Sequence, residues 1–372
     1  MLMHVLVTGG VGFIGSHVVD ALLDRGDTVT ILDSLFGRVH PTGQPPKFVP
    51  TQARIIRGDV TDRNAWSEAL VGTDAVVHLA AYQDYQPDFS RFAHVNGAGT
   101  ALLYEAAIGM PRPPRKILVA SSQAIYGEGA YTCTDHGRRF PHPRSLQQLE
   151  SGQWDILCNV CHVKMKPVPC HEDHPHPHNA YAISKQTQEG YALVLGERYG
   201  IPSTALRYSI VQGPRQSPAN AYSGVLRAFV SQLLRDQAPV VFEDGQQLRD
   251  YTHIDDVVAA TLLTLDDARA NFDVFNVGGG STISVLEYAR LIAEALGLDI
   301  EPDISGRFRV GDTRHVSSDT SKLQALGWRS TRSMQKIVSD YVDSLDRTML
   351  DADWVGQALD AMEASGTLRR TV

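Results

Sequence analysis

The first half of the chain alternates short apolar runs with amphipathic stretches. Each apolar run is bounded by Gly, Asp or Ser, as buried parallel strands tend to be. The runs are residues 4–7, 28–32, 54–56, 75–79 and 116–120. The stretches between them, such as residues 16–25 and 96–108, have the spacing of helices. Strands that alternate with helices predict an α/β fold with a doubly wound parallel sheet and right-handed crossovers.

The pattern breaks between residues 127 and 178, where Pro, His, Cys and short polar runs dominate. Loops of this length without structure of their own are unusual, so we expect an ordered insert. Regularity returns with a helix at 179–199 and a strand at 204–208. The mixed pattern that follows, with helices at 223–235 and 284–296, is typical of a smaller C-terminal lobe.

These features predict a domain organisation. We expect residues 1–210 to form the sheet domain, with a Cys-rich insert at about 128–178. Residues 211–345 should form a substrate-binding lobe, and residues 346–372 a terminal helix or tail.

Composition excludes several classes of function. The chain has 372 residues, 43% of them hydrophobic, and a net charge of −8. This charge gives no basic field for nucleic acid or an anionic membrane, and no apolar run approaches the roughly 20 residues that span a bilayer. Residues 1–15 have the pattern of a strand, a turn and a helix start rather than a secretion signal. We therefore expect a cytoplasmic protein with neither nucleic-acid nor membrane partners.

A glycine turn follows the first predicted strand and opens a helix. Its glycines are Gly9, Gly12 and Gly15, which permit a tight turn and close approach of a pyrophosphate to the helix N-terminus. Asp33 ends the second strand, where an acid accepts both ribose hydroxyls and repels a 2′-phosphate. The sequence therefore predicts a Rossmann-type domain that binds NAD, while Arg38 nearby leaves NADP open.

A catalytic set follows from two further segments. Ser122 ends the fifth predicted strand, and Tyr181 and Lys185 lie four residues apart on a predicted helix, hence on one face. A nearby ammonium and the nicotinamide charge would lower the tyrosine pKa from about 10. We expect Tyr181 to act as a base, Lys185 to approach it through the cofactor ribose, and Ser122 to bond the reacting oxygen.

Together these motifs resemble the extended short-chain dehydrogenase/reductases that act on nucleotide sugars, the group of UDP-glucose 4-epimerase and its relatives. The resemblance runs from residue 5 to about residue 328. Further matching segments are His78-Leu79-Ala80-Ala81, Val95-Asn96, Leu206-Arg207-Tyr208, Gln247-Leu248-Arg249-Asp250-Tyr251 and Gly311-Asp312-Thr313-Arg314-His315.

The resemblance implies further roles. The cofactor-binding residues would also include Phe13, Ile14, Asp59, Val60, Leu79, Ala80, Ala81, Asn96, Tyr181 and Lys185. Asp59 can alternatively be a plain loop cap. Arg249 and Arg314 would clamp the diphosphate of a UDP-sugar, a task that suits the guanidinium fork. A homodimer through the helices at 96–108 and 179–199 is also implied.

The residues after Ser122 favour one reaction. Relatives that are dehydratases carry an Asp-Glu pair there, whereas this chain has Gln123, which we expect to touch the substrate, and Ala124. Neither can move protons, so the minimal set fits a 4-epimerase with a transient 4-keto sugar. Ile210 stands near a position where the family commonly has Asn, which suggests a modified sugar pocket. The alternatives are a uronic acid decarboxylase, an oxidoreductase, or a catalytically silent NAD-binding regulator.

All four cysteines lie in the insert: Cys133, Cys158, Cys161 and Cys170. A Cys-x-x-Cys turn plus two further thiols can close a structural zinc site, with His162 and His171 as reserve ligands. The alternative is four free cysteines in a variable loop. The histidines at 174, 176 and 178 alternate with proline, and we expect them to be surface residues rather than ligands.

Overall fold

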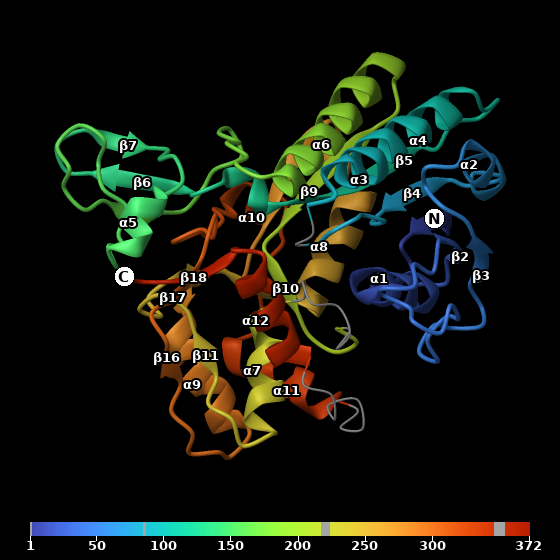
Figure 1. Ribbon diagram of the computed structural model, residues 1–372. Helices are drawn as coiled ribbons and strands as arrows, with labels where there is room; N and C mark the ends of the chain where they lie inside the picture. The colour runs from blue at the N-terminus through green and yellow to red at the C-terminus, as the bar shows by residue number, and fades with distance from the viewer. Residues whose placement is uncertain (1, 85–86, 217–223, 346–353) are drawn as a thin grey trace.

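A seven-stranded parallel sheet forms the centre of the molecule (Figure 1). The computed structural model describes residues 2–84, 87–216, 224–345 and 354–372. In spatial order the strands are β14 (Asp273–Val277), β9 (Ser203–Tyr208), β5 (Lys116–Ser122), β4 (Ala75–His78), β1 (His4–Thr8), β2 (Thr28–Asp33) and β3 (Arg54–Arg57). The predicted α/β fold with a doubly wound parallel sheet is confirmed, and each predicted strand lies within two residues of its observed bounds.

Helices cover both faces of this sheet. Side chains alternate between the two faces along each strand, and here both faces carry apolar side chains that must be buried. Val5 and Val7 of β1 belong to one core with helices α1 (Phe13–Asp24) and α8 (Ile254–Asp266). Leu6 between them belongs to the opposite core. Helices on that second side are α2 (Arg63–Ala69), α4 (Gly99–Ile108) and α6 (Ala180–Tyr199).

Two helices show how the sequence sets their ends. The Asn179 side chain accepts a hydrogen bond of 2.8 Å from the Ala182 amide and caps α6. Gly200 ends it with a left-handed φ of 66°. The helix predicted at 96–108 begins earlier, with α3 (Phe89–Phe92) and a π-helical turn, η1 (Ala93–Ala98), before α4.

The insert is ordered, as predicted. A 3₁₀ turn, η2 (Gln123–Tyr126), leads from β5 into a small antiparallel sheet with the order β7-β6-β8. Its elements are β6 (Ala130–Cys133), β7 (Gly137–Arg139), α5 (Leu146–Glu150) and β8 (Lys166–Val168). Figure 1 shows this unit projecting on the side of the molecule away from β1 to β3.

The C-terminal lobe has its own core of buried side chains. Its elements are β10 (Ile210–Gln212), α7 (Val225–Leu233), β11 (Val240–Val241), β12 (Leu248–Arg249), β13 (Tyr251–His253), β15 (Ile283–Ser284), α9 (Val285–Ala295), β16 (Asp303–Ile304), β17 (Arg307–Arg309) and α11 (Met334–Asp343). Residues 254–277 interrupt this lobe, because they belong to the sheet domain. Strand β14 pairs within the central sheet, and α8, η3 (Ala268–Ala270) and α10 (Ser321–Ala325) contribute to the core on one of its faces. The lobe is therefore assembled from separated segments rather than from a continuous 211–345.

The chain's last described segment packs on this lobe. Helix α12 (Trp354–Ala364) is followed by β18 (Leu368–Arg370), which pairs antiparallel with β17. The predicted terminal helix and tail thus include a strand, and residues 346–353 of that prediction lie outside the described residues. Residue 223 of the helix predicted at 223–235 lies outside them too.

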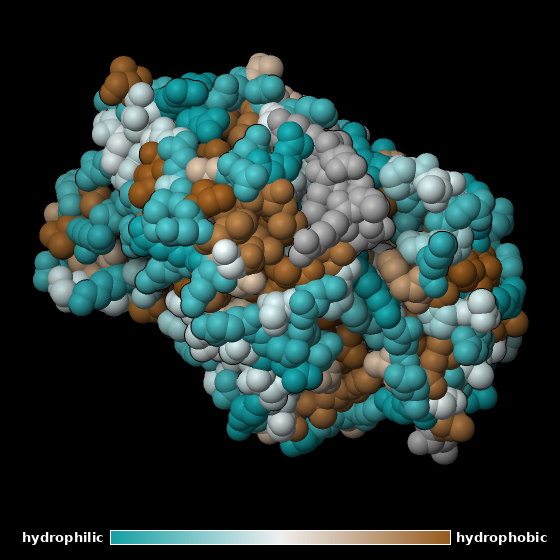
Figure 2. Space-filling view, turned by 90° about the horizontal axis from the view of Figure 1, so that it is seen from below, coloured by the Kyte–Doolittle hydropathy of each residue, from teal (hydrophilic) through white to brown (hydrophobic). Residues whose placement is uncertain are grey.

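The face in Figure 2 is mostly hydrophilic, with apolar residues gathered toward its centre and lower part. None of the helices in the described ranges combines the length and apolarity that crossing a membrane requires.

Candidate active site

The glycine turn joins β1 to α1 in a conformation that depends on glycine. Gly9 has a φ of 69°, and a Cβ there would lie 2.9 Å from the Ala80 amide nitrogen. A Cβ on Gly15 would lie 2.2 Å from the Gly9 carbonyl oxygen. The N-cap, Gly12, supplies no side-chain cap, and the first turn carries no acid. The helix therefore presents its N-terminus uncapped, as a pyrophosphate site requires.

Asp33 lies beside this turn at the end of β2. Its carboxylate accepts hydrogen bonds from the amides of Val11 (3.2 Å) and Leu35 (2.9 Å). These bonds hold the carboxylate next to the glycine turn, where the ribose of a bound dinucleotide would lie. Arg38 forms an ion pair with Asp84. The Arg38 guanidinium, which could have bound the 2′-phosphate of NADP, is thus paired with a carboxylate.

Other predicted cofactor residues border the same end of the sheet. Leu79, Ala80 and Ala81 follow β4, and the Ala80 amide donates to the Thr8 hydroxyl at 3.1 Å. The Asp59 carboxylate accepts from the Thr61 amide at 2.9 Å, so it acts as a loop cap. The Val60 carbonyl accepts from the Trp66 indole at 2.7 Å.

The side chain of Asn96, a predicted cofactor residue, is hydrogen-bonded within the protein in this structure. It accepts from the Tyr82 amide at 2.7 Å, donates to the Tyr82 carbonyl at 3.0 Å and donates to the Ser184 hydroxyl at 2.9 Å. The residue lies in the π-helical turn and is fully buried. Asn96 therefore ties the chain after β4 to helix α6.

The structure brings Ser122 and Tyr181 together. Ser122 ends β5, Tyr181 lies in the first turn of α6, and their side chains are hydrogen-bonded. Burial raises the pKa of Tyr181 to about 12, and the Ser122 hydrogen bond partly opposes this rise. The phenol is therefore protonated at neutral pH in the protein alone, and the lowered pKa expected with the cofactor charge present stays a prediction for the complex.

Lys185 is buried one turn further along α6. Its Nζ donates to the Ala120 carbonyl at 2.7 Å and to Gln188 Oε1 at 2.8 Å. Burial lowers the pKa of the ammonium to about 7. Gln188 was not among the predicted residues, although its position three residues after Lys185 puts it on the same helical face.

The substrate lobe places two arginines beside one carboxylate, and they are not the predicted pair. Arg249 Nη2 lies 3.8 Å from Asp312 Oδ1, and Arg309 Nη2 lies 3.0 Å from the same oxygen. Both arginines are partly exposed. Arg309 precedes the Gly311-Asp312 turn and Arg314 follows it. The family resemblance was applied to Arg314, so Arg309 was not among the predicted residues.

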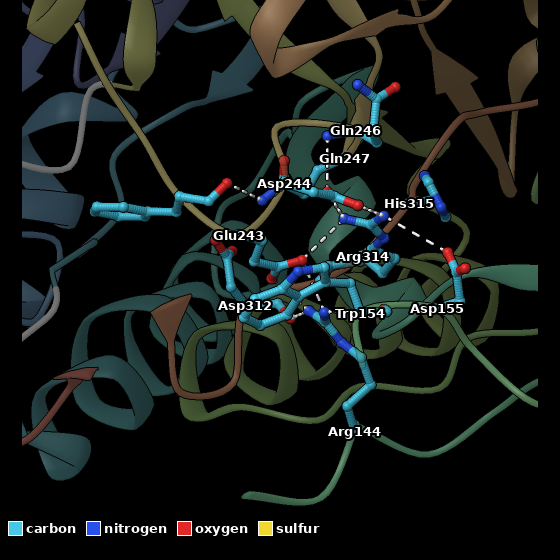
Figure 3. Close-up of polar contacts among 12 residues, drawn as sticks. Arg144, Trp154, Asp155, Glu243, Asp244, Gln246, Gln247, Asp312, Arg314 and His315 are labelled. Carbon is cyan, nitrogen blue, oxygen red and sulfur yellow. Dashed lines mark hydrogen bonds and ion pairs between the residues drawn. The ribbon is translucent and has the colours of Figure 1, made fainter. Parts of the chain in front are cut away.

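Arg314 instead lies in a closed ion-pair network, which is drawn in Figure 3. Its guanidinium donates to Asp244 at 2.6 and 2.8 Å and to Glu243 at 3.0 Å, and only 2% of its side chain is exposed. These two carboxylates occupy the Arg314 fork, so in this structure the Arg314 guanidinium is engaged within the protein, and the expected pairing of Arg249 with Arg314 as a diphosphate clamp stays a prediction.

The predicted four-cysteine group is also corrected. Cys133, Cys158 and Cys161 come together, but the fourth side chain beside them is His136. Cys170 lies in a different buried cluster, with Ile125 and Tyr126 among its members, and is not a member of the metal-ligating group. Neither reserve histidine, His162 or His171, is in the group.

Of the three histidines expected at the surface, His174 is exposed, whereas His176 and His178 are partly buried. The rings of His176 and His178 lie with that of His142 in a second cluster, in which the ligand nitrogens are all within 4.8 Å of one another. Burial lowers the pKa of His178 to about 4. His176 also donates its amide to the Ile125 carbonyl at 2.7 Å, which ties the segment before α6 to η2.

Comparisons with known proteins agree with this geometry. The sequence model of the NAD dependent epimerase/dehydratase family matches residues 5–146 and 164–278. The chain belongs to this family. A dTDP-L-rhamnose 4-epimerase of Burkholderia thailandensis is 33% identical over 363 residues, which cover 96% of each chain. The chain is thus an enzyme of the extended short-chain dehydrogenase/reductase type.

Solved structures of family members have the same architecture. A UDP-glucose 4-epimerase of Thermotoga maritima with UDP-glucose has a TM-score of 0.76 and 31% identity, covering 93% of this chain and all (100%) of that one. A UDP-glucose 4-epimerase of Thermus thermophilus in complex with NAD has a TM-score of 0.71 and 30% identity, covering 92% and 98%. Both similarities extend over the sheet domain and the C-terminal lobe.

Proposed function

We propose that this family member is an NAD-dependent nucleotide-sugar 4-epimerase. The observation that carries the proposal is the hydrogen-bonded pair of Ser122 and Tyr181 at the sheet edge that also carries the glycine turn, with neither a carboxylate nor a cysteine in the turn Gln123–Tyr126 that follows Ser122. Bound NAD would take a hydride from carbon 4 of the sugar and return it to the opposite face. Similar proteins that are named 4-epimerases of dTDP- and UDP-sugars support the same reaction.

The chain's own groups have distinct tasks in this proposal. Tyr181 takes the proton of the 4-hydroxyl as the hydride leaves and gives it back when the hydride returns. Ser122 bonds the same oxygen and holds it beside the phenol. Lys185, when released from Ala120 and Gln188 by the cofactor ribose, would place its positive charge near the phenolate.

The surroundings of Ser122 support epimerisation over dehydration. A dehydratase needs groups that move protons at neighbouring sugar carbons, and Gln123 and Ala124 have none to offer. The next acid along the chain, Glu128, is 3% exposed and accepts a hydrogen bond from the Arg314 amide. Its carboxylate therefore bonds to the C-terminal lobe and is not placed for proton transfer to the sugar.

The substrate's diphosphate would lie between Arg249 and Arg309. Two guanidinium groups supply the local positive charge that a protein of net charge −8 lacks globally. Asp312, which both arginines contact, fixes their mutual position. Similar proteins are named for both dTDP-sugars and UDP-sugars, so the experiment below varies the nucleotide as well as the sugar.

We also propose a homodimer that works in the cytoplasm. Ile183, Tyr191 and Val194 on α6 are 54%, 37% and 65% exposed, and their spacing places them along one side of the helix. An exposed apolar stripe on a long helix is typical of a subunit contact. Nucleotide-sugar substrates and unpaired cysteines are consistent with a reducing intracellular compartment.

An NMR time course without added reductant tests the proposed reaction. The purified protein, with NAD, is given UDP-glucose, UDP-galactose, UDP-glucuronate, their N-acetylated forms and dTDP-L-rhamnose. Interconversion of 4-epimers with no net NADH is the expected result, and Tyr181→Phe is the inactive control. Loss of carbon dioxide or stoichiometric NADH would replace the proposal with a decarboxylase or an oxidoreductase. NAD binding without turnover of any substrate would favour the silent regulator.

A further inference from the structure

Three sulfurs and one imidazole nitrogen converge at the tip of the insert. The Cys133 sulfur lies 3.5 Å from His136 Nδ1 and 3.6 Å from the Cys161 sulfur. The Cys158 sulfur lies 3.6 Å from the same His136 nitrogen. All four ligand atoms are within 4.8 Å of one another. The group therefore has the size of one coordination sphere.

The distances fit a tetrahedral metal site and not a disulfide. A disulfide bond is about 2.05 Å long, far shorter than the 3.6 Å between Cys133 and Cys161. Four ligands at about 2.0 to 2.3 Å from a zinc ion lie about 3.3 to 3.8 Å apart when they form a tetrahedron. The three measured edges fall within that interval.

The backbone around each pair of ligands has the same shape. Cys133 and His136 are separated by two residues, as are Cys158 and Cys161. The residue after each pair is left-handed: Gly137 has a φ of 66° and His162 a φ of 57°. A non-glycine residue in this conformation is uncommon. Two equivalent turns, which face each other, therefore present the four ligands.

Backbone amides also point at the sulfurs. The Cys158 sulfur accepts from the amides of Cys161 and Val160, and the Cys161 sulfur accepts from Val163. The Cys133 sulfur accepts from Asp135 and His136. The backbone amides of the two turns therefore hold the sulfurs in place.

The insert has little else to hold this tip together. Its local core consists of Tyr131, Ile156 and Met165 together with the three clustered cysteines. A core this small cannot offset the conformational entropy of ordering the segment, whereas a structural metal can. Residues 147–163, which hold Cys158 and Cys161, are also the stretch where the family match is interrupted. Two of the four ligands thus lie outside the segments that the family model matches.

We infer that Cys133, His136, Cys158 and Cys161 bind one structural Zn²⁺. Protein side chains fill all four positions, so the ion has no open position for substrate or water. Its role is to fold the insert. The folded insert then docks on the substrate lobe through Arg144, Trp154 and Asp155, which contact Glu243, Phe308 and Arg314.

Metal analysis of the full chain, made without a histidine tag and without added zinc, tests the inference. We expect about one zinc per chain by inductively coupled plasma mass spectrometry. Cys158→Ser and His136→Ala should lose most of it, and His136→Cys should keep it. Cys170→Ser is the matched control: it removes a buried cysteine outside the group and should retain zinc. Replacing the zinc with Co²⁺ should give the absorption of a tetrahedral thiolate complex.

Several results would overturn the inference. They are wild-type protein that holds no zinc even after zinc is supplied, iron in its place, or a zinc content that falls as far in Cys170→Ser as in Cys158→Ser. The wild-type stoichiometry and the cobalt spectrum remain decisive even where a variant fails to fold. None of these readouts depends on turnover, so they are independent of the proposed epimerase reaction.

Discussion

Arg144 of the insert and Glu243 of the substrate lobe form a buried bidentate ion pair. Nη1 and Nη2 of the arginine each lie 2.9 Å from a carboxylate oxygen, and both side chains are 1% exposed. The Arg144 guanidinium also donates to the carbonyls of Trp154 and Asp312. Figure 3 shows Arg144 and Arg314 converging on Glu243. The pair therefore links the insert to the segment that carries Asp312.

Breaking this pair should destabilise the protein strongly. Arg144→Met leaves the Glu243 charge buried with one arginine fewer, and removing one partner of a buried pair costs about 3–5 kcal/mol. Arg54→Met is the control, because Arg54 and Glu68 are each 58% exposed and such pairs contribute about 0–1 kcal/mol. The free energy of unfolding from urea titration distinguishes them. Equal losses in both variants would contradict the assignment.

Tyr181 should titrate differently with and without NAD. Burial raises the pKa of Tyr181 to about 12 in the protein alone, and the positive nicotinamide and a repositioned Lys185 should lower the pKa in the complex. The phenolate difference spectrum of wild type minus Tyr181→Phe isolates this one tyrosine among 13. An identical titration in both states would argue against Tyr181 as the base.

The Tyr181→Phe change should also act on chemistry and not on cofactor binding. A general base contributes about 10²–10⁴-fold to the rate, so kcat should fall by that range. The dissociation constant of NAD, from calorimetry, should stay within about threefold because the substitution removes only the hydroxyl. A variant that keeps kcat would require another base.

Lys185 should make the stability of the cofactor-free protein depend on pH. Burial lowers the pKa of Lys185 from 10.5 to about 7. Between these values the unfolded chain binds the proton and the folded chain does not, so stability rises with pH across this window. Each unit contributes at most about 1.4 kcal/mol.

Comparison of unfolding curves from pH 7 to 10 measures this effect. Lys185→Met should flatten the rise, whereas Lys164→Met, at a side chain 66% exposed, should leave it unchanged. If wild type and Lys185→Met show the same slope, Lys185 is charged in the folded protein throughout this range.

Local patterns were enough to predict the sheet, the glycine turn and the helix that carries Tyr181 and Lys185. Apolar strands, glycines and a helix cap are specified by neighbouring residues, so the sequence displays them directly. The π-helical turn at Ala93–Ala98 left no such trace, since it differs from an α-helix only in hydrogen-bond register.

Choices between chemically similar residues needed the three-dimensional structure. Counting cysteines favoured Cys170 as the fourth ligand, whereas the Cys-x-x-His spacing from Cys133 to His136 was visible but not used. The choice between Arg309 and Arg314 depended on which of them meets Glu243 and Asp244, residues about 65 to 71 positions away in the chain. Sequence spacing carries no information on such contacts.

Substitution of the two arginines beside Asp312 tests whether Arg309 or Arg314 accompanies Arg249 in binding the diphosphate. Charged hydrogen bonds contribute about 1.5–3 kcal/mol, so Arg249→Gln and Arg309→Gln should each raise the KM for the nucleotide sugar by about 10- to 100-fold. Arg314→Gln should instead lower the free energy of unfolding, because Glu243 and Asp244 lose a buried partner. An unchanged KM in Arg309→Gln, with a raised KM and normal stability in Arg314→Gln, would restore the original pairing.

The exposed side of α6 should determine the oligomeric state. Val194→Arg places a charge within the proposed subunit contact, where an unpaired buried charge costs several kcal/mol, and should convert a dimer to a monomer in sedimentation experiments. Val71→Arg is matched to it, since both valines are 65% exposed and Val71 follows α2, away from the proposed contact. It should leave the dimer intact. A wild-type protein that sediments as a monomer at micromolar concentration would exclude the contact, and dissociation by Val71→Arg alone would move it to another face.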